Sequence, residues 1–363
     1  MHGAPAILLA NTLGLALGGS AGPEAAIAAF GGAFATAIYS LPYIRNRNLI
    51  SPSDHRLFVL SCMSIGISSI LPSPIIAVSL ISELFALSHG LGSVYLKYVV
   101  SSGIGGCVAY AVTNGIGTVS SSRFSEDWNE SLATPSGIFA DYLPLQSILL
   151  GIIGCVLGYV FLGAQLLLKQ LSKKLVVNLN ALSKFKLGTI LTPAIGGIFV
   201  GVIAWILPGT TGVGEAGMVF LSQQPSAEGD AALFVATGLL KLLSLSICLS
   251  FGWTGGMIYP LLFIGSSVGA GISEATGWNR LLCMSCVAAS LMSSHMPAPY
   301  AFWATTTSVY RAGLGSSYGT LISILVALLF GVALGTKQRL IIKLTKNNEL
   351  KRSTVYLNLA VDD

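Results

Sequence analysis

The chain has 363 residues, of which 53% are hydrophobic and only 9% are charged. Its mean hydropathy of +0.78 excludes two soluble domains, which the length alone would favour, and predicts an all-α, polytopic membrane protein. The formal net charge is +5, and short basic segments are expected on the cytoplasmic side, whereas the acidic stretch at residues 120–141 is expected outside. We therefore expect an integral, multi-pass protein of the lipid bilayer that binds no nucleic acid.

Apolar runs separated by turn residues predict membrane helices, several of them shorter than the roughly 20 residues that span a bilayer. The predicted helices occupy residues 4–17, 23–41, 57–70, 74–87, 95–116, 143–168, 187–207, 231–251, 281–293, 300–310 and 321–334, with a further one from the break at 255–260 to about 272. Proline-containing breaks at residues 71–74 and 296–299 interrupt the pattern. Short runs of this kind are typical of half-length helices that neighbouring helices cover.

The order of features in residues 19–116 returns in residues 255–335: a glycine-rich break, a helix, a charged turn, a short helix, a Pro-x-Pro break and further helices. Internal repeats with broken helices are typical of transporters whose substrate site lies near the bilayer midplane. We therefore predict an inverted-repeat helical bundle with broken and half-length helices. The chain divides into a first-repeat portion (1–175), a basic cytoplasmic linker (176–186), a second repeat (187–340) and a cytoplasmic tail (341–363).

Two glycine-bearing breaks lead directly into apolar helices: GSAGP at residues 19–23 and GGMIYP at residues 255–260. Amides at a helix start carry partial positive charge, so each break favours an anion that is held weakly enough to leave again. The alternative is that both are ordinary helix starts with glycine packing. The predicted anion-binding residues are Gly19, Ser20, Ala21, Gly22, Pro23, Gly256, Met257, Ile258 and Tyr259. The amides expected to face the anion are those of Ala21, Gly22, Met257 and Ile258.

Three charged residues lie within or beside apolar runs and are candidates for gating or for the pathway: Glu24, Glu83 and Lys241. A charge in the membrane is costly and is usually retained for function. Glu24 either gates the pathway or is a carboxylate favoured by the start of its own helix. Glu83 either faces a water-filled cavity or lies at a cytoplasmic helix end. Lys241 either attracts anions, or pairs with Glu215 or extends its ammonium to the interface.

The remaining polar residues predict neither catalysis nor cofactor binding. No nucleophile, base and orienting group gather around either break, so we do not expect an enzyme. Cys283 and Cys286 form a C-x-x-C, but no second pair and no His cluster accompanies them. We expect these thiols to pack as small hydrophobic groups, and we expect no metal and no cofactor.

Taken in order, these features resemble the CLC family of chloride channels and chloride/proton antiporters over nearly the whole chain. Residues 19–23 are similar to that family's GREGP motif, and residues 256–260 are similar to its GxFxP motif, with Ile258 in the phenylalanine position. Ser73-Pro74, with Glu83 downstream, is similar to the family's pair of short helices. The resemblance implies a homodimer that moves chloride or another small anion, with one pathway in each subunit.

Two departures from the family pattern bear on proton coupling. Ala21 stands where the family has its gating glutamate, and a methyl group can neither compete with an anion nor relay a proton. The family's inner proton-relay glutamate falls at Leu84, with Glu83 one residue before it and about 100° away around a helix. We therefore expect passive, channel-like or uncoupled movement of small anions, chloride first. The alternative is a proton-coupled chloride antiporter that uses Glu24 or Glu83.

Two further departures concern completeness. The family's anion-coordinating tyrosine, expected near Leu340 or Ile341, has no counterpart between Tyr318 and Tyr356. Nothing before Gly19 matches the family's GSGIP motif, which the resemblance places at least one helix earlier. A fragment, a shortened gene model and a naturally truncated member all fit these observations. The sequence therefore leaves open a second alternative, a truncated and non-conducting family member.

Overall fold

The computed structural model describes residues 3–46, 50–71, 73–86, 95–115, 143–181, 187–214, 217–218, 230–296, 298–310 and 317–330. Within these ranges the chain is helical, with a π-helical turn at Ser82–Ala86 and a 3-10 turn at Pro208–Thr210. The same ranges contain no strand, and their one isolated backbone bridge belongs to the site. The predicted all-α architecture is confirmed.

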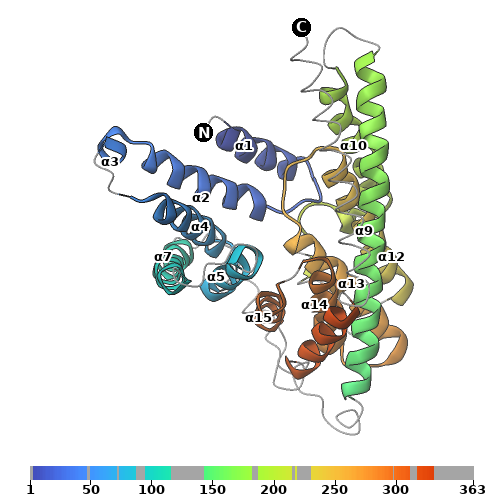
Figure 1. The fold of residues 1–363 in the computed structure, drawn as a ribbon. Helices are drawn as coiled ribbons and strands as arrows, with labels where there is room; N and C mark the ends of the chain where they lie inside the picture. The colour runs from blue at the N-terminus through green and yellow to red at the C-terminus, as the bar shows by residue number, and fades with distance from the viewer. Residues whose placement is uncertain are drawn as a thin grey trace.

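The helices divide into two groups along the chain. Those up to residue 181 are α1 (Gly3–Ala16), α2 (Glu24–Tyr39), α3 (Pro42–Asn46), α4 (Pro52–Ser68), α5 (Pro74–Ile81), α7 (Tyr95–Gly115) and α9 (Leu143–Ala181). Those after it are α10 (Leu187–Ile206), α12 (Ala231–Ser250), α13 (Ile258–Thr276), α14 (Arg280–His295), α15 (Pro299–Val309) and a helix at Ser317–Phe330. In Figure 1, α2, α4, α5 and α7 gather on one side, whereas α10, α12 and α14 pack on the long α9 on the other.

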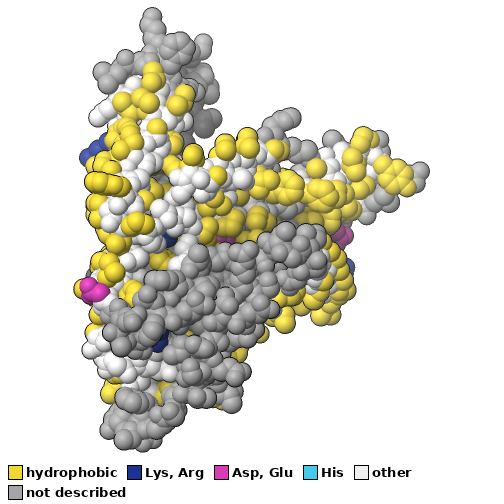
Figure 2. Space-filling model, turned by 180° about the vertical axis from the view of Figure 1, so that it is seen from behind, with side chains coloured by type: hydrophobic (Ala, Val, Ile, Leu, Met, Phe, Trp, Pro, Cys, Tyr) yellow, Lys and Arg dark blue, Asp and Glu magenta, His cyan; other side chains and the backbone are white. Residues whose placement is uncertain are grey.

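The described surface is that of a membrane protein. Helices α9, α10, α12 and α13 are long and apolar enough to cross a bilayer. Shorter apolar helices occur at Pro5–Ala16, Glu24–Tyr39, Pro74–Leu84 and Ser317–Phe330. Figure 2 shows a face on which hydrophobic side chains predominate and charged side chains are few. Apolar surface on this scale is stable against lipid rather than water, in agreement with a multi-pass chain.

Most predicted helices agree with the structure to within a few residues, but two are longer than expected. Helix α4 begins at Pro52 rather than at residue 57, because the Ser51 hydroxyl accepts the Asp54 amide at 3.1 Å and caps the first turn. Helix α9 continues to Ala181 rather than ending at residue 168, because its lysine-rich end consists largely of good helix formers. The helix thus enters the expected linker, of which residues 182–186 lie outside the described ranges.

The two proline-containing breaks divide helices as expected. The first separates α4 from α5, and the second separates α14 from α15. Each following helix starts with a proline, Pro74 in α5 and Pro299 in α15, which has no amide to leave unpaired. The other prolines of these breaks, Pro72 and Pro297, lie outside the described residues. The half-length helices are therefore present where the sequence predicts them.

Helices α13 and α14 form the most tightly packed pair of the core. A Cβ on Gly265 would lie 2.3 Å from the Ala288 Cα, and one on Gly269 would lie 2.5 Å from the Cys283 carbonyl oxygen. Small residues allow membrane helices to approach this closely. Cys283 and Cys286 are buried in α14 as free thiols, in the packing role expected for them. The pair thus gives α13 a rigid support along its length.

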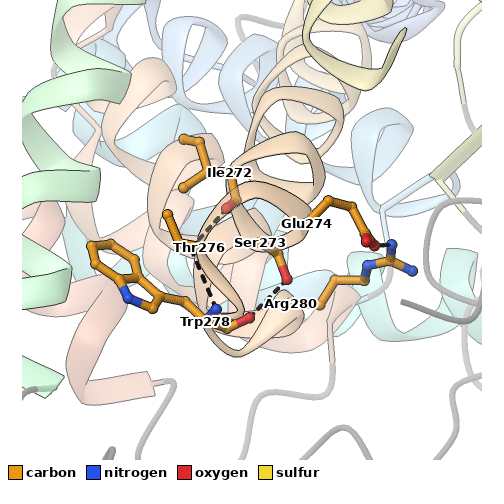
Figure 3. Close-up of polar contacts among 6 residues, drawn as sticks. All are labelled: Ile272, Ser273, Glu274, Thr276, Trp278 and Arg280. Carbon is orange, nitrogen blue, oxygen red and sulfur yellow. Dashed lines mark hydrogen bonds and ion pairs between the residues drawn. The ribbon is translucent and has the colours of Figure 1, made fainter. Parts of the chain in front are cut away.

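The end of α13 is fixed by a compact turn, drawn in Figure 3. Gly277 ends the helix with φ +71°, a left-handed conformation that glycine adopts readily. The Glu274 carboxylate forms an ion pair with Arg280, the first residue of α14, and the two side chains are 5% and 2% exposed. The Ser273 hydroxyl donates to the Trp278 carbonyl at 2.7 Å. The turn thus fixes the end of α13 relative to the start of α14.

Candidate functional site

The two glycine breaks predicted from the sequence meet in the structure. Gly22 and Gly256 exchange both backbone hydrogen bonds, with N–O distances of 2.7 and 2.6 Å, and form an antiparallel bridge. Each glycine lies two positions before the first residue of its helix, which is Glu24 in α2 and Ile258 in α13. A reciprocal pair between equivalent residues has the local two-fold relation expected of an inverted repeat. Helices α2 and α13 therefore start from one place.

The bridge decides which amides remain for an anion. The Gly22 amide donates to the Gly256 carbonyl, so it does not face an anion, in contrast to the prediction. Among the residues that the structure describes, the amides of Ala21, Met257 and Ile258 donate to no protein acceptor. Three of the four predicted amides are therefore still open at the two helix starts. Their partial positive charge has not been neutralised by the protein backbone.

The carboxylate of Glu24 occupies the space between the breaks. Its Oε1 accepts the Tyr259 amide at 2.8 Å in the first turn of α13, and the residue is 3% exposed. A Cβ on Gly256 would lie 1.8 Å from Glu24 Oε2, and one on Gly22 would lie 2.1 Å from it, so both glycines make room for the carboxylate. Oε2 is buried without a hydrogen-bond partner among the described residues. Glu24, the first residue of α2, thus also caps the start of α13, where an anion was predicted.

Helix α1 supplies a contact that the sequence analysis missed. The Asn11 side chain is 3% exposed, and its Nδ2 donates to the Thr254 carbonyl at 2.7 Å and to the Gly22 carbonyl at 3.3 Å. One side-chain amide thereby binds both breaks. The available signal was a lone Asn in an apolar helix, because such residues commonly bond across membrane helices. Trp253 strengthens the same junction, since a Cβ on Gly19 would lie 2.6 Å from its ring.

Lys241 and Ser20 meet in a second polar cluster, beside the first break. Lys241 is fully buried in α12, and its ammonium donates to the carbonyls of Thr210 at 2.8 Å, Thr211 at 3.5 Å and Gly212. It also lies 3.4 Å from the Ser20 hydroxyl oxygen. The ammonium is therefore turned into the protein and does not extend to the interface. Residue 215, the predicted alternative partner, lies outside the described part of the chain.

Two further contacts join the helices of the first group to those of the second. Both carboxylate oxygens of Glu83 accept amides of the first turn of α15, from Tyr300 at 3.1 Å and from Ala301 at 3.0 Å. This is the capping role that a helix N-terminus favours. The Tyr259 hydroxyl donates to the Ile70 carbonyl, close to the break after α4. Glu83 thus serves a different helix start from Glu24, and the structure does not bring it to the glycine breaks.

Comparisons with known proteins agree with this architecture. The sequence model of the voltage-gated chloride channel family matches residues 2–331. Among solved structures, the fold is similar to a slow cyanobacterial Cl⁻/H⁺ antiporter, with a TM-score of 0.71 and 18% identity over 92% of this chain and 73% of that chain. It is also similar to a CLC-type fluoride/proton antiporter, with a TM-score of 0.59 and 20% identity over 89% of this chain and 73% of that chain. No curated protein sequence matches. The resemblance seen in the sequence is thus confirmed, and the chain belongs to the voltage-gated chloride channel family.

Proposed function

We propose that this chain moves small anions, chloride first, across a membrane along a path past the starts of α2 and α13. The observation that carries the proposal is the Gly22–Gly256 bridge, which brings two helix starts together and leaves the amides of Ala21, Met257 and Ile258 open. Helix starts attract an anion without the full charge that would trap it. Membership of a family of chloride channels supports the same function.

We propose further that this movement is channel-like or uncoupled from protons. Ala21 stands at the centre of the first break; the residue is 3% exposed, and its methyl group lies close to Gly255. Leu84 stands at the inner relay position of the resemblance, and its neighbour Glu83 is engaged by the start of α15. Neither position offers a carboxylate that can pass a proton to or from the glycine breaks.

A second candidate is proton-coupled chloride exchange with Glu24 as the relay. One observation favours it: the Glu24 carboxylate lies at the α13 start, so an arriving anion has to displace it from the Tyr259 amide. Two similar solved structures are described as Cl⁻/H⁺ and fluoride/proton antiporters. In both candidates the anion and Glu24 compete for one place. The candidates differ in whether a proton moves when the carboxylate leaves.

Flux from proteoliposomes distinguishes the candidates. For the uncoupled candidate, a chloride gradient should drive chloride efflux through the reconstituted wild-type chain, with K⁺ and valinomycin to carry the compensating charge, while the external pH of a weakly buffered solution stays constant. Proton uptake in fixed proportion to chloride would instead establish coupled exchange. If the folded chain alone gives no more chloride efflux than protein-free liposomes, the transport proposal is wrong and the non-conducting alternative is favoured.

We also propose that the chain is a homodimer with one anion path in each subunit, as the family resemblance implies. Exposed hydrophobic residues recur at every fourth position of α7 and form one continuous face: Leu96, Val100, Ile104, Val108 and Val112. Such a face contacts lipid or another subunit. Light scattering in detergent should give a protein mass twice the 37.7 kDa of one chain, whereas the mass of a single chain would contradict the proposal.

A further inference from the structure

The cluster around Lys241 has the composition of a site for a monovalent cation. Four neutral oxygens surround the ammonium, and we call them the carbonyl cage: the backbone oxygens of Thr210, Thr211 and Gly212 and the Ser20 hydroxyl oxygen. A lysine ammonium has three N–H donors and no acceptor, so these oxygens are sufficient to satisfy it. Channels and transporters use the same ligands, carbonyls of unwound backbone, in place of the hydration shell of Na⁺ or K⁺.

The cage is held together by contacts in which Lys241 takes no part. The 3-10 turn Pro208–Thr210 and the left-handed Gly212, with φ +62°, bend the backbone around the ammonium. The Ser20 hydroxyl donates to the Thr210 carbonyl at 3.1 Å, and the Gly212 amide donates to the Gly18 carbonyl at 3.2 Å. The Ser20 oxygen also lies 2.7 Å from the Ser244 hydroxyl. The oxygens are therefore directed at one point by the fold itself.

We infer that the carbonyl cage is a monovalent-cation site whose built-in occupant is the ammonium of Lys241. Carbonyl dipoles that converge with their negative ends repel one another, and a cation between them turns this repulsion into attraction. The cage joins the connector at residues 210–212 to Gly18 and Ser20, on either side of Gly19 in the first break. The charge of Lys241 thus fixes the segment that presents the Ala21 amide, and a free cation of the right shape can take its place.

The variant Lys241→Ala tests the inference, because it deletes Cγ, Cδ, Cε and Nζ, the atoms of an n-propylammonium ion. We expect the Tm of the purified variant in detergent to fall by about 5 °C or more, since it leaves buried carbonyls without their cation. Millimolar n-propylammonium should reverse most of this decrease in Tm and should leave the wild-type Tm unchanged. n-Propanol, which has the shape without the charge, and tetramethylammonium, which has the charge without N–H donors, should have no effect.

Two further variants make the test specific. Adding Ser20→Ala to Lys241→Ala removes one cage oxygen and should weaken the apparent affinity for n-propylammonium by about tenfold. Lys97→Ala, at an exposed position of α7, is the matched control and should neither lose stability nor respond to the amine. Because unfolding is measured without transport, this result stands apart from the proposed anion transport. Chloride flux through Lys241→Ala, recorded without a pH gradient, should show the same dependence on the amine.

Several outcomes would overturn the inference. Equal stabilisation of Lys241→Ala by n-propanol would show that filling the cavity is enough. A wild-type Tm for this variant, or a lowered Tm that no primary ammonium ion raises, would show that no cation is needed. Lys241→Met covers the case in which the alanine variant fails to fold, because methionine fills the space of the stem. The Tm of Lys241→Met should rise with ammonium ions and not with n-propylammonium. A decrease in the Tm of this variant that ammonium does not reverse contradicts the inference.

Discussion

Replacing Gly256 with valine is expected to lower chloride flux strongly and to leave the protein folded. The new Cβ would lie 1.8 Å from Glu24 Oε2 and 3.0 Å from Glu24 Cβ, in the space that the Glu24 side chain occupies at the α13 start. Neither Gly256 nor Gly22 has a positive φ, so the backbone accepts a side chain and the effect comes from crowding alone. A crowding cost of about 1–3 kcal/mol on the anion-bound state corresponds to a decrease of roughly 5- to 150-fold in flux. Gly22→Val, with its Cβ 2.1 Å from Oε2, should act alike.

The matched control is Gly201→Val in α10, where an added Cβ meets no heavy atom within 4 Å, and wild-type flux is expected there. The double variant Gly256→Val with Glu24→Ala identifies the cause of the block. Flux that returns to the wild-type level in the double variant assigns the loss to the displaced carboxylate, and flux that stays low assigns it to covered amides. If Gly22→Val and Gly256→Val both transport chloride like the wild type, the site assignment is wrong.

Emptying the place held by Glu24 is expected to raise the apparent affinity for chloride. In the wild type the Glu24 carboxylate accepts the Tyr259 amide at 2.8 Å. In Glu24→Ala an anion no longer has to displace this carboxylate. A charge at a helix end contributes up to about 2 kcal/mol, and 1.4 kcal/mol corresponds to about tenfold in affinity. We expect the half-saturating chloride concentration for initial flux to fall by about tenfold. Glu24→Gln keeps the acceptor oxygen without the charge, so its half-saturating chloride concentration should lie between those of the wild type and Glu24→Ala.

A suitable control is Asp230→Asn, because Asp230 is an exposed residue that also caps a helix. It accepts the Ala232 and Leu233 amides of α12 at 2.9 and 3.4 Å and lies outside the glycine breaks. Its half-saturating concentration should equal that of the wild type. A half-saturating chloride concentration in Glu24→Ala equal to that of the wild type would refute competition between the carboxylate and the anion. If the wild type carries protons, their loss in Glu24→Gln assigns the relay to Glu24.

Helix positions were largely predictable because the features that set them are local. The proline-containing breaks and the apolar runs placed α7 and α10 within one residue of their observed ends. The end of α9 was missed for a physical reason. Hydropathy falls at the first lysines, but lysine, leucine and glutamine continue a helix well, so its last turns extend to Ala181 beyond the apolar run.

The site was predictable only in part. The two glycine breaks were found because helix-start chemistry is visible in five or six residues. Their pairing was not, and it is this pairing that removes the Gly22 amide from the predicted set. The expectation for Glu24 was a role at its own helix or at a gate, and the contact of its carboxylate with Tyr259, 235 positions away in sequence, was not predictable. Asn11 and Thr254 are 243 positions apart. No local pattern contains contacts over such separations.

The Gly22–Gly256 bridge also determines when the site can form during synthesis. Gly22 reaches the membrane long before Gly256, and until Gly256 follows, the Gly22 amide lacks the carbonyl to which it donates in the finished protein. An unsatisfied backbone group within hydrocarbon costs several kcal/mol, so the early chain must keep this break in water or against other protein. Closing so long a loop is slow as well as late. Pairing of the two glycine breaks is therefore a late step of insertion, and a delay in synthesis after α12 prolongs the stage in which the first break is unpaired.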